Sequence, residues 1–253
     1  MFAVALIGCD GKLIRLGPGT PNADGGADGS ASDRMDGASG ADAGDTGPAI
    51  DAPSGDGSPP CLHGAVAANE VLWIGDSWVL MPGLQHTAVR EAARAIGAIG
   101  PSEDYVIAAA AGASMAAIAN QYVTQESTAT KVKILIMDGG TWDTITSGGT
   151  ADSVNSAAAA FVQLLSRVAT DGTVQHIIYF LMPELANIPG VTALRPLFKS
   201  ACEQSSVPCH FIDLQTRWSP QYTAPGDTFP NNAGAQVLAN EIWTTMQDQC
   251  IAQ

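Results

Sequence analysis

A serine follows a short apolar run at the start of the folded part of this chain. Residues 71–74 read Val-Leu-Trp-Ile, and Gly75, Asp76 and Ser77 come next. A buried strand that turns at a glycine into a helix exposes a hydroxyl at the helix start, where backbone N–H groups can bind an anion. The alternative is that Ser77 only caps the helix, which is a common use of serine.

Three later segments carry residues of the same kind. Gly112 follows a second apolar run and lets the backbone approach a ligand, although a plain strand-to-helix turn explains it equally well. Residues 138–143 read Asp-Gly-Gly-Thr-Trp-Asp after a third run, and residues 225–234 read Pro-Gly-Asp-Thr-Phe-Pro-Asn-Asn-Ala-Gly. If the apolar runs are parallel strands, these segments meet at one edge of a sheet.

Apolar runs alternate with helical patterns from residue 71 onward. Strands that are apolar throughout and separated by helices predict a parallel sheet covered on both faces. We therefore expect an α/β fold, a three-layer α/β/α sandwich with a parallel sheet of about five strands. The predicted strands are 71–74, 105–110, 132–137, 177–182 and 211–214, and the predicted helices are 85–96, 114–122, 151–169, 191–202 and 233–246.

The order and context of these segments resemble the SGNH/GDSL hydrolase superfamily, whose fold is flavodoxin-like, from about residue 71 to residue 246. The resemblance implies a serine ester hydrolase that acts on acyl or carbohydrate esters without a cofactor. It places the nucleophile on Ser77 and an oxyanion-hole glycine on Gly112, with the backbone N–H of Ser77 as a further oxyanion donor.

Two blocks depart from the family pattern. In the third block, which is Gly-x-Asn-Asp in the family, Trp142 stands in place of the asparagine that donates to the oxyanion, or Thr141 if the register shifts by one. In the last block, Asp-x-x-His, Gly226 stands in place of the aspartate and Phe229 in place of the histidine. Asp227 is displaced by one position. We take Asp227 as the remaining acidic candidate, and the Thr141 hydroxyl or the Trp142 indole as replacement oxyanion donors.

The loss of the histidine matters because a serine hydroxyl is a poor nucleophile without an adjacent base. In a serine protease, loss of the serine or the histidine costs about 10⁶ in turnover. Loss of one oxyanion donor costs a further ~10²–10³. An ordinary carboxylate is too weak a base to compensate. We expect none of the four histidines to act as the base, although His63 is left open; the four are His63, His86, His176 and His210.

The first sixty residues have a different composition. Residues 1–9 end in Leu-Ile-Gly-Cys, which resembles a bacterial lipobox with Cys9 as the lipid attachment site; the alternative is a fortuitous apolar terminus. Residues 10–60 are rich in Gly, Asp, Ala, Ser and Pro and predict a disordered linker. Residues 61–253 then form the SGNH-like domain. This organisation predicts a bacterial envelope protein, lipid-anchored or secreted.

The remaining cysteines predict an oxidising compartment. We expect the disulfides Cys61–Cys250 and Cys202–Cys209, the alternative being four free thiols. No Cys-x-x-Cys pair or histidine-rich set is present, so we expect no metal site.

The net charge of the chain excludes some classes of binding partner. Eleven basic against 25 acidic residues give a net charge of −14, which argues against nucleic acid and against electrostatic binding to an anionic membrane. We expect a monomer whose partner is a small-molecule or glycan ester, with membrane attachment only through a lipid on Cys9.

Three functions stay open from the sequence. The first is an ester hydrolase that uses Ser77. The second is a pseudoenzyme, in which Phe229 and Trp142 offer aromatic surface to a glycan, an acyl group or a partner, unless they merely fill space. The third is a structural protein of the cell envelope, in which the linker over residues 10–60 contributes more to function than the folded domain.

Overall fold

The computed structural model describes residues 66–128, 131–185, 188–223 and 226–251. The chain divides into two units, Met1–Gly55 and Asp56–Gln253, and all described residues belong to the second. The predicted lipobox and linker and residues 61–65 lie outside the described residues, so the predicted domain boundaries stay predictions.

The centre of the described unit is a five-stranded parallel sheet, as the sequence predicted. Its strands are β1 (Val71–Ile74), β2 (Val106–Ile107), β3 (Ile134–Met137), β4 (His176–Leu181) and β5 (Cys209–Asp213). Their spatial order is β2-β1-β3-β4-β5, and every pair is parallel. β1 and β3 are buried at every position, which explains why these strands are apolar throughout instead of alternating.

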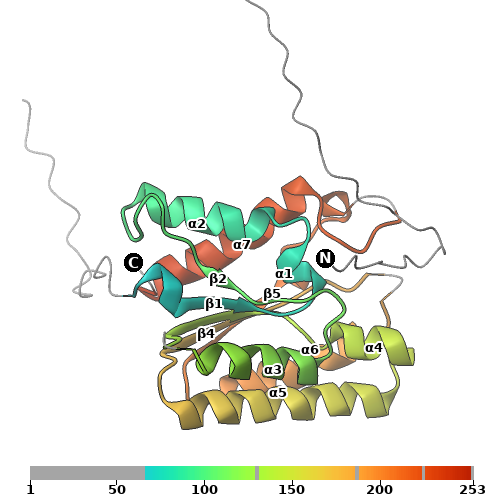
Figure 1. Cartoon of the computed structure of the whole chain (residues 1–253). Helices are drawn as coiled ribbons and strands as arrows, with labels where there is room; N and C mark the ends of the chain where they lie inside the picture. Colours follow the sequence, from blue (N-terminus) through green and yellow to red (C-terminus); the bar gives the residue numbers. More distant parts are fainter. Residues whose placement is uncertain (1–65, 129–130, 186–187, 224–225, 252–253) are drawn as a thin grey trace, which may run out of the picture. The chain divides into compact units, whose positions relative to one another are not determined.

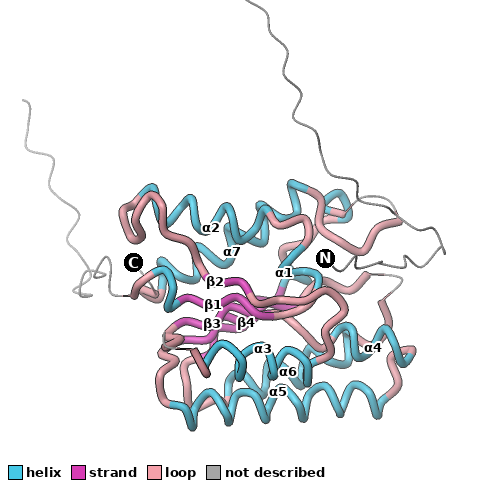
Figure 2. Tube along the Cα trace, viewed as in Figure 1, coloured by secondary structure: helices cyan, strands magenta, loops and turns pink. Residues whose placement is uncertain are grey.

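Helices cover both faces of the sheet, giving the predicted three layers (Figure 1; Figure 2). One face carries α2 (Leu84–Ala95) and α7 (Asn232–Asp248), which pack against each other. The other carries α3 (Met115–Glu126), α4 (Thr141–Ser147), α5 (Ala151–Asp171) and α6 (Val191–Glu203). The short α1 (Ser77–Leu80) follows β1, and three 3₁₀ turns complete the order: Ala68–Glu70, Leu214–Thr216 and Pro220–Tyr222.

Aromatic side chains fill the layer between the sheet and α5 and α6. The ring of Phe161 on α5 stacks on Phe198 of α6, with centroids 4.7 Å apart, and contacts Tyr179 of β4 at 4.8 Å. All three side chains are buried. Burial of such large rings, each worth about 1.5–3 kcal/mol or more, holds these helices on the sheet.

The strand order makes the junction of β1 and β3 the topological switch point of the sheet. The chain leaves β1 toward the α2 and α7 face, whereas it leaves β3 toward the α4 and α5 face. Ligands of open α/β sheets bind where neighbouring strands diverge in this way, beyond the carboxyl ends of the strands. Ser77 follows β1 and Trp142 follows β3, so both belong to this edge.

The predicted strand boundaries differ from the structure at the two sheet edges. The prediction of a strand over 105–110 was too long, because regular pairing covers only Val106 and Ile107. Ala108 and Ala110 still donate backbone N–H groups to Trp73 and Gly75, so the chain keeps following β1 without a regular ladder. The last strand begins at Cys209 instead of Phe211, because Cys209 already pairs with Ile177.

The predicted disulfide Cys202–Cys209 is confirmed. It joins the end of α6 to the start of β5, with the two Cα atoms 5.2 Å apart. Cys250 is also disulfide-bonded. Its predicted partner Cys61 lies outside the described residues, so that pairing stays a prediction.

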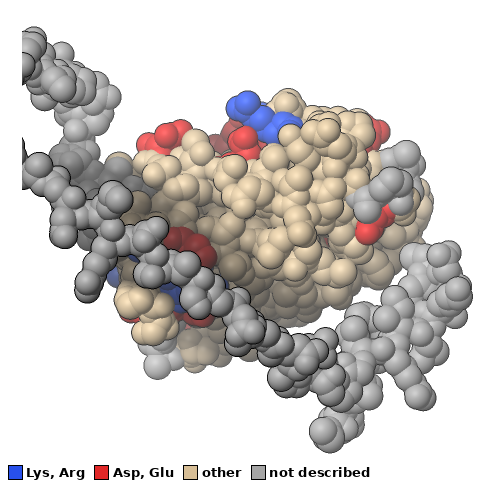
Figure 3. All heavy atoms as spheres, turned by 90° about the horizontal axis from the view of Figure 1, so that it is seen from above, with Lys and Arg blue, Asp and Glu red and all other residues tan. Residues whose placement is uncertain are grey.

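The face formed by α2 and α7 carries few charged side chains, and both signs occur together (Figure 3). Arg90 forms ion pairs with Glu91 and Asp104, and Arg94 pairs with Glu91. Within the described ranges, no helix is both long and apolar enough to span a bilayer.

Candidate functional site

Ser77 is the first residue of α1, directly beyond the carboxyl end of β1. The preceding Asp76 caps this helix, because its Oδ1 accepts the backbone N–H of Trp78 at 3.1 Å. The Ser77 side chain is half-buried. Among the described residues, no group hydrogen-bonds to the Ser77 hydroxyl. Asp76, and not Ser77, therefore caps this helix.

Buried and half-buried polar groups fix the turn before Ser77. The Gln121 amide of α3 spans Gly75, accepting its N–H at 2.8 Å and donating to its carbonyl at 3.0 Å. The backbone N–H of Asp76 donates to Asp138 Oδ1 at 2.7 Å. Gly75 has φ +144°, and a Cβ there would lie 1.9 Å from Asp138 Oδ1. Only glycine fits this turn.

Asp76 and Asp138 form a buried carboxyl pair behind the serine, at 3% and 4% exposure. Burial, and next the negative charge of Asp76, raise the pKa of Asp138 well above its usual range. Burial therefore favours the protonated form of Asp138 over the ionised form. Thr141 is also buried, and its hydroxyl donates to Asp76 Oδ2 at 3.0 Å. The Thr141 proton is thus engaged with a carboxylate behind the turn.

Gly112 and Trp142 lie against each other at the same edge. A Cβ at Gly112 would lie 3.3 Å from two carbons of the Trp142 ring. The Trp142 side chain remains 38% exposed, so one part of the ring packs on backbone and another faces solvent. The next residue, Asp143, accepts the Met115 backbone N–H at 2.8 Å, which ties α4 to the start of α3. Burial raises the pKa of Asp143.

The loop over 226–231 reaches the serine helix from the other side. The indole N–H of Trp78 donates to the Thr228 carbonyl at 3.0 Å. Asp227 is exposed, and its Oδ1 accepts the backbone N–H groups of Thr228 and Phe229 at 2.7 and 3.1 Å. The half-buried Phe229 packs against the core. Asp227 thus shapes its own loop, and Phe229 contributes a hydrocarbon ring without a titratable group.

The described histidines are engaged elsewhere. His86 on α2 packs edge-on against Trp73, with ring centroids 6.3 Å apart, and burial and the charge of Arg90 lower its pKa. His176 and His210 belong to the amino-terminal ends of β4 and β5, at the opposite edge of the sheet from Ser77. His63 lies outside the described residues.

Sequence reasoning missed three residues that hold the site. The sequence did not indicate a role for Gln121 or Trp78. A single amide or indole side chain within a helical pattern is normally interpreted as a surface or core residue. Asp138 belongs to the segment 138–143, but the sequence predicted no role for it. An aspartate directly after an apolar strand and before two glycines was the available signal, since both strand ends converge there.

Neither the known protein-family models nor the curated proteins contain a match to this sequence. Solved structures do match. An acetyl esterase mutant crystallised with acetate is 16% identical, with a TM-score of 0.58 over 73% of this chain and 98% of its own. A family 3 carbohydrate esterase from Clostridium thermocellum is 14% identical, with a TM-score of 0.60 over 74% and 98%.

A lipolytic protein of the G-D-S-L family from Veillonella parvula is 17% identical, with a TM-score of 0.54 over 69% of this chain and 97% of its own. Each match spans nearly the whole of the other chain at an identity that identifies the fold and not the activity. The resemblance seen in the motifs is therefore supported by the three-dimensional structure, and this chain has the α/β/α fold of the SGNH/GDSL hydrolases.

Proposed function

We propose that this protein is a non-catalytic member of the SGNH fold that binds an acyl or carbohydrate ester at the Ser77 edge of the sheet. The observation that carries the proposal is the loop over 226–231. It approaches the serine helix as a catalytic loop would, yet it presents Phe229, and its carboxylate is bonded to its own backbone.

The remaining groups at this edge suit binding better than turnover. The exposed part of the Trp142 ring offers an apolar face of the type that stacks on sugar rings and acyl chains. The Ser77 hydroxyl adds one hydrogen-bonding group beside it. Because Trp142 rests on the Gly112 backbone, little side-chain entropy is lost when a ligand stacks on the ring.

The alternative is ester hydrolysis through Ser77 with an unusual base. One observation favours it: the turn before Ser77 is held by Gln121 and Asp138 in a buried network that leaves the hydroxyl free. A base from outside the described residues, such as His63, would then be required.

Binding of acetylated xylo-oligosaccharides to the full chain, followed by isothermal titration calorimetry and NMR, tests the proposal. We expect Trp142→Ala to weaken binding by about 1–3 kcal/mol, the value of a stacked ring with its buried area. Leu197→Ala is the matched control, because Leu197 is equally exposed at 38% but lies on α6. Absence of binding to acetylated and simple acyl esters alike, or equal loss in both variants, would contradict the proposal.

We also propose that Cys9 carries a lipid and that the domain acts at a bacterial envelope. The sequence around Cys9 supports this. Mass spectrometry of the membrane-bound protein tests it, since a retained Met1 would exclude cleavage at the lipobox.

A further inference from the structure

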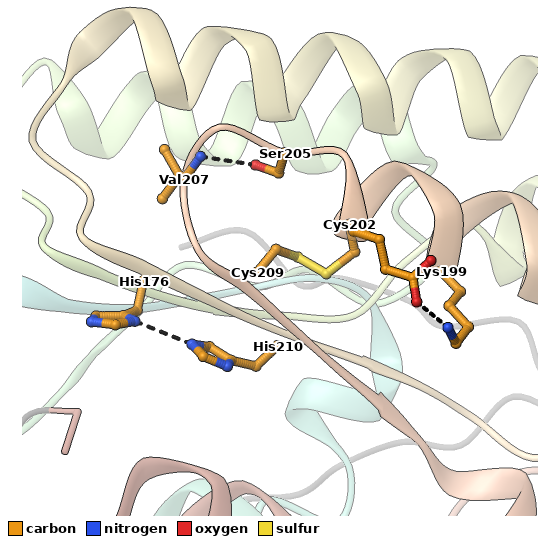
Figure 4. Close-up of a disulfide and its surroundings, with 8 residues drawn as sticks. His176, Lys199, Cys202, Ser205, Val207, Cys209 and His210 are labelled. Carbon is orange, nitrogen blue, oxygen red and sulfur yellow. Dashed lines mark hydrogen bonds and ion pairs between the residues drawn. A yellow bond between two sulfur atoms is a disulfide. The ribbon is translucent and has the colours of Figure 1, made fainter. Parts of the chain in front are cut away.

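Two histidines face each other at the amino-terminal edge of the sheet, away from the serine site. His176 begins β4 and His210 is the second residue of β5. The Nδ1 of His176 lies 3.1 Å from the Nε2 of His210. Both rings project to the same side of the two strands, opposite the Cys202–Cys209 disulfide (Figure 4). Both side chains are half-buried, so solvent reaches the pair.

The spacing of the two nitrogens fits a shared cation. Two ring nitrogens this close must have a proton or a metal ion between them, because two lone pairs repel. A transition metal binds imidazole nitrogen at about 2.0–2.1 Å, which places two ligands of one ion about 2.9–3.4 Å apart for angles between 90° and tetrahedral. The observed 3.1 Å lies within this interval. Rotation of both rings away from the line that joins the two nitrogens would turn both lone pairs toward one ion.

The strands hold the pair in place before any ion arrives. His210 pairs with Ile178 in the β4–β5 ladder, which fixes its register relative to His176. Cys209, the residue before His210, is joined to α6 by the disulfide. Preorganised ligands lose little freedom on binding.

We propose that His176 and His210 bind one divalent transition-metal ion of the kind that imidazole favours: Cu²⁺, Zn²⁺ or Ni²⁺. Within the described part of the chain, no cluster of three or more His, Cys, Asp or Glu residues forms a metal site, so the proposed site has two protein ligands. The site is independent of ligand binding at Ser77. The sequence predicted no metal because no local motif exists: the two ligands are brought together only by strand pairing.

Titration of the tag-free full chain with Cu²⁺, followed by electron paramagnetic resonance, tests the site. The wild-type spectrum should show one bound ion per chain with two imidazole nitrogens. His176→Gln and His210→Gln should each abolish this signal at concentrations that saturate the wild type. His86→Gln, which alters another half-buried histidine, should leave the signal unchanged.

A second measurement does not depend on the folding of the variants. In wild-type protein with isotope-labelled histidine, Zn²⁺ should shift the ring resonances of His176 and His210 and leave those of His86 unmoved. Absence of a two-nitrogen Cu²⁺ spectrum, or a spectrum that survives in either glutamine variant, overturns the proposal.

Discussion

Asp138 is the residue on which the serine turn depends most. It accepts the Asp76 N–H from a position with almost no solvent, and it lies against the turn so closely that Gly75 tolerates no side chain. A protonated carboxyl there can donate to the neighbouring carboxylate and accept from the backbone at once. Asparagine offers the same donor and acceptor without a titrating proton.

Replacing Asp138 by Asn should change how stability depends on pH. The native pKa of Asp138 is raised, so the folded state keeps a proton that the unfolded chain releases above its ordinary pKa. The wild type therefore loses unfolding free energy as pH rises above that value, by up to about 1.4 kcal/mol per pH unit. Asp138→Asn should remove this decline, and urea denaturation at pH 4, 6 and 8 measures it.

Asp138→Asn needs no separate control variant, because asparagine can keep the hydrogen bonds of Asp138 and removes only the titrating carboxyl group. The gain of Asp138→Asn over wild type should increase from pH 4 to pH 8. Parallel pH profiles for the two proteins would show that Asp138 does not hold the extra proton.

A site residue could be predicted from the sequence only where a suitable residue type stood directly after a predicted strand. Ser77 was placed beyond the first strand because a glycine follows an apolar run, and Gly112 and Trp142 were assigned to the same edge. The direction of the Thr141 hydroxyl, toward Asp76, was not predictable. It depends on two buried carboxylates that come from different strands.

At the scale of elements, long periodic segments were predictable and short ones were not. The helix over 151–169 is α5, and its apolar face carries Phe161 and Leu164 as the spacing predicted. The start of α1 at Ser77 was expected from the glycine turn, but its extent and the whole of α4 were not predicted, because four and seven residues are too few to show a helical period. These two short helices carry Ser77 and Trp142, so the site was the part least accessible to pattern reasoning.

The disulfide is the covalent link between two elements, and its removal should lower stability. Cys202 and Cys209 are separated by seven positions, and closure of such a short loop stabilises a fold by about 2–3 kcal/mol in the chain-entropy model. The double change Cys202→Ser and Cys209→Ser should therefore lower the unfolding free energy by about this amount. Urea denaturation measures the loss.

Ser205→Ala provides a control in the same loop. It removes one hydrogen bond to the Val207 N–H and should cost about 1 kcal/mol or less. If the double cysteine variant unfolds at the same urea concentration as wild type, the link does not stabilise the junction of α6 and β5.

At the scale of the whole molecule, acidic charge is spread over two parts with different composition. Residues 1–60 hold nine aspartates and three basic residues, and the remainder holds sixteen acidic and eight basic residues. The first part has too little apolar composition to predict a core, whereas the second forms the three-layer unit. The acidic balance of both parts disfavours polyanionic partners.

The elements that meet at the Ser77 edge differ in how far they keep the family pattern. By the motif resemblance, β1 and α1 would keep the serine turn, Trp142 on α4 would stand where the family has an amide, and Gly226 and Phe229 would stand where it has an acid and a base. Restoring the last two, as Gly226→Asp with Phe229→His, should create hydrolysis that disappears when Ser77→Ala is added.

The most direct test of a serine site without a base is hydrolysis of p-nitrophenyl acetate and butyrate by the full chain and by Ser77→Ala. Loss of the base lowers turnover by about 10⁶, so both proteins should hydrolyse the esters at the same rate, equal to background. Turnover by the wild type that Ser77→Ala abolishes would show that a base reaches Ser77 and would contradict the account.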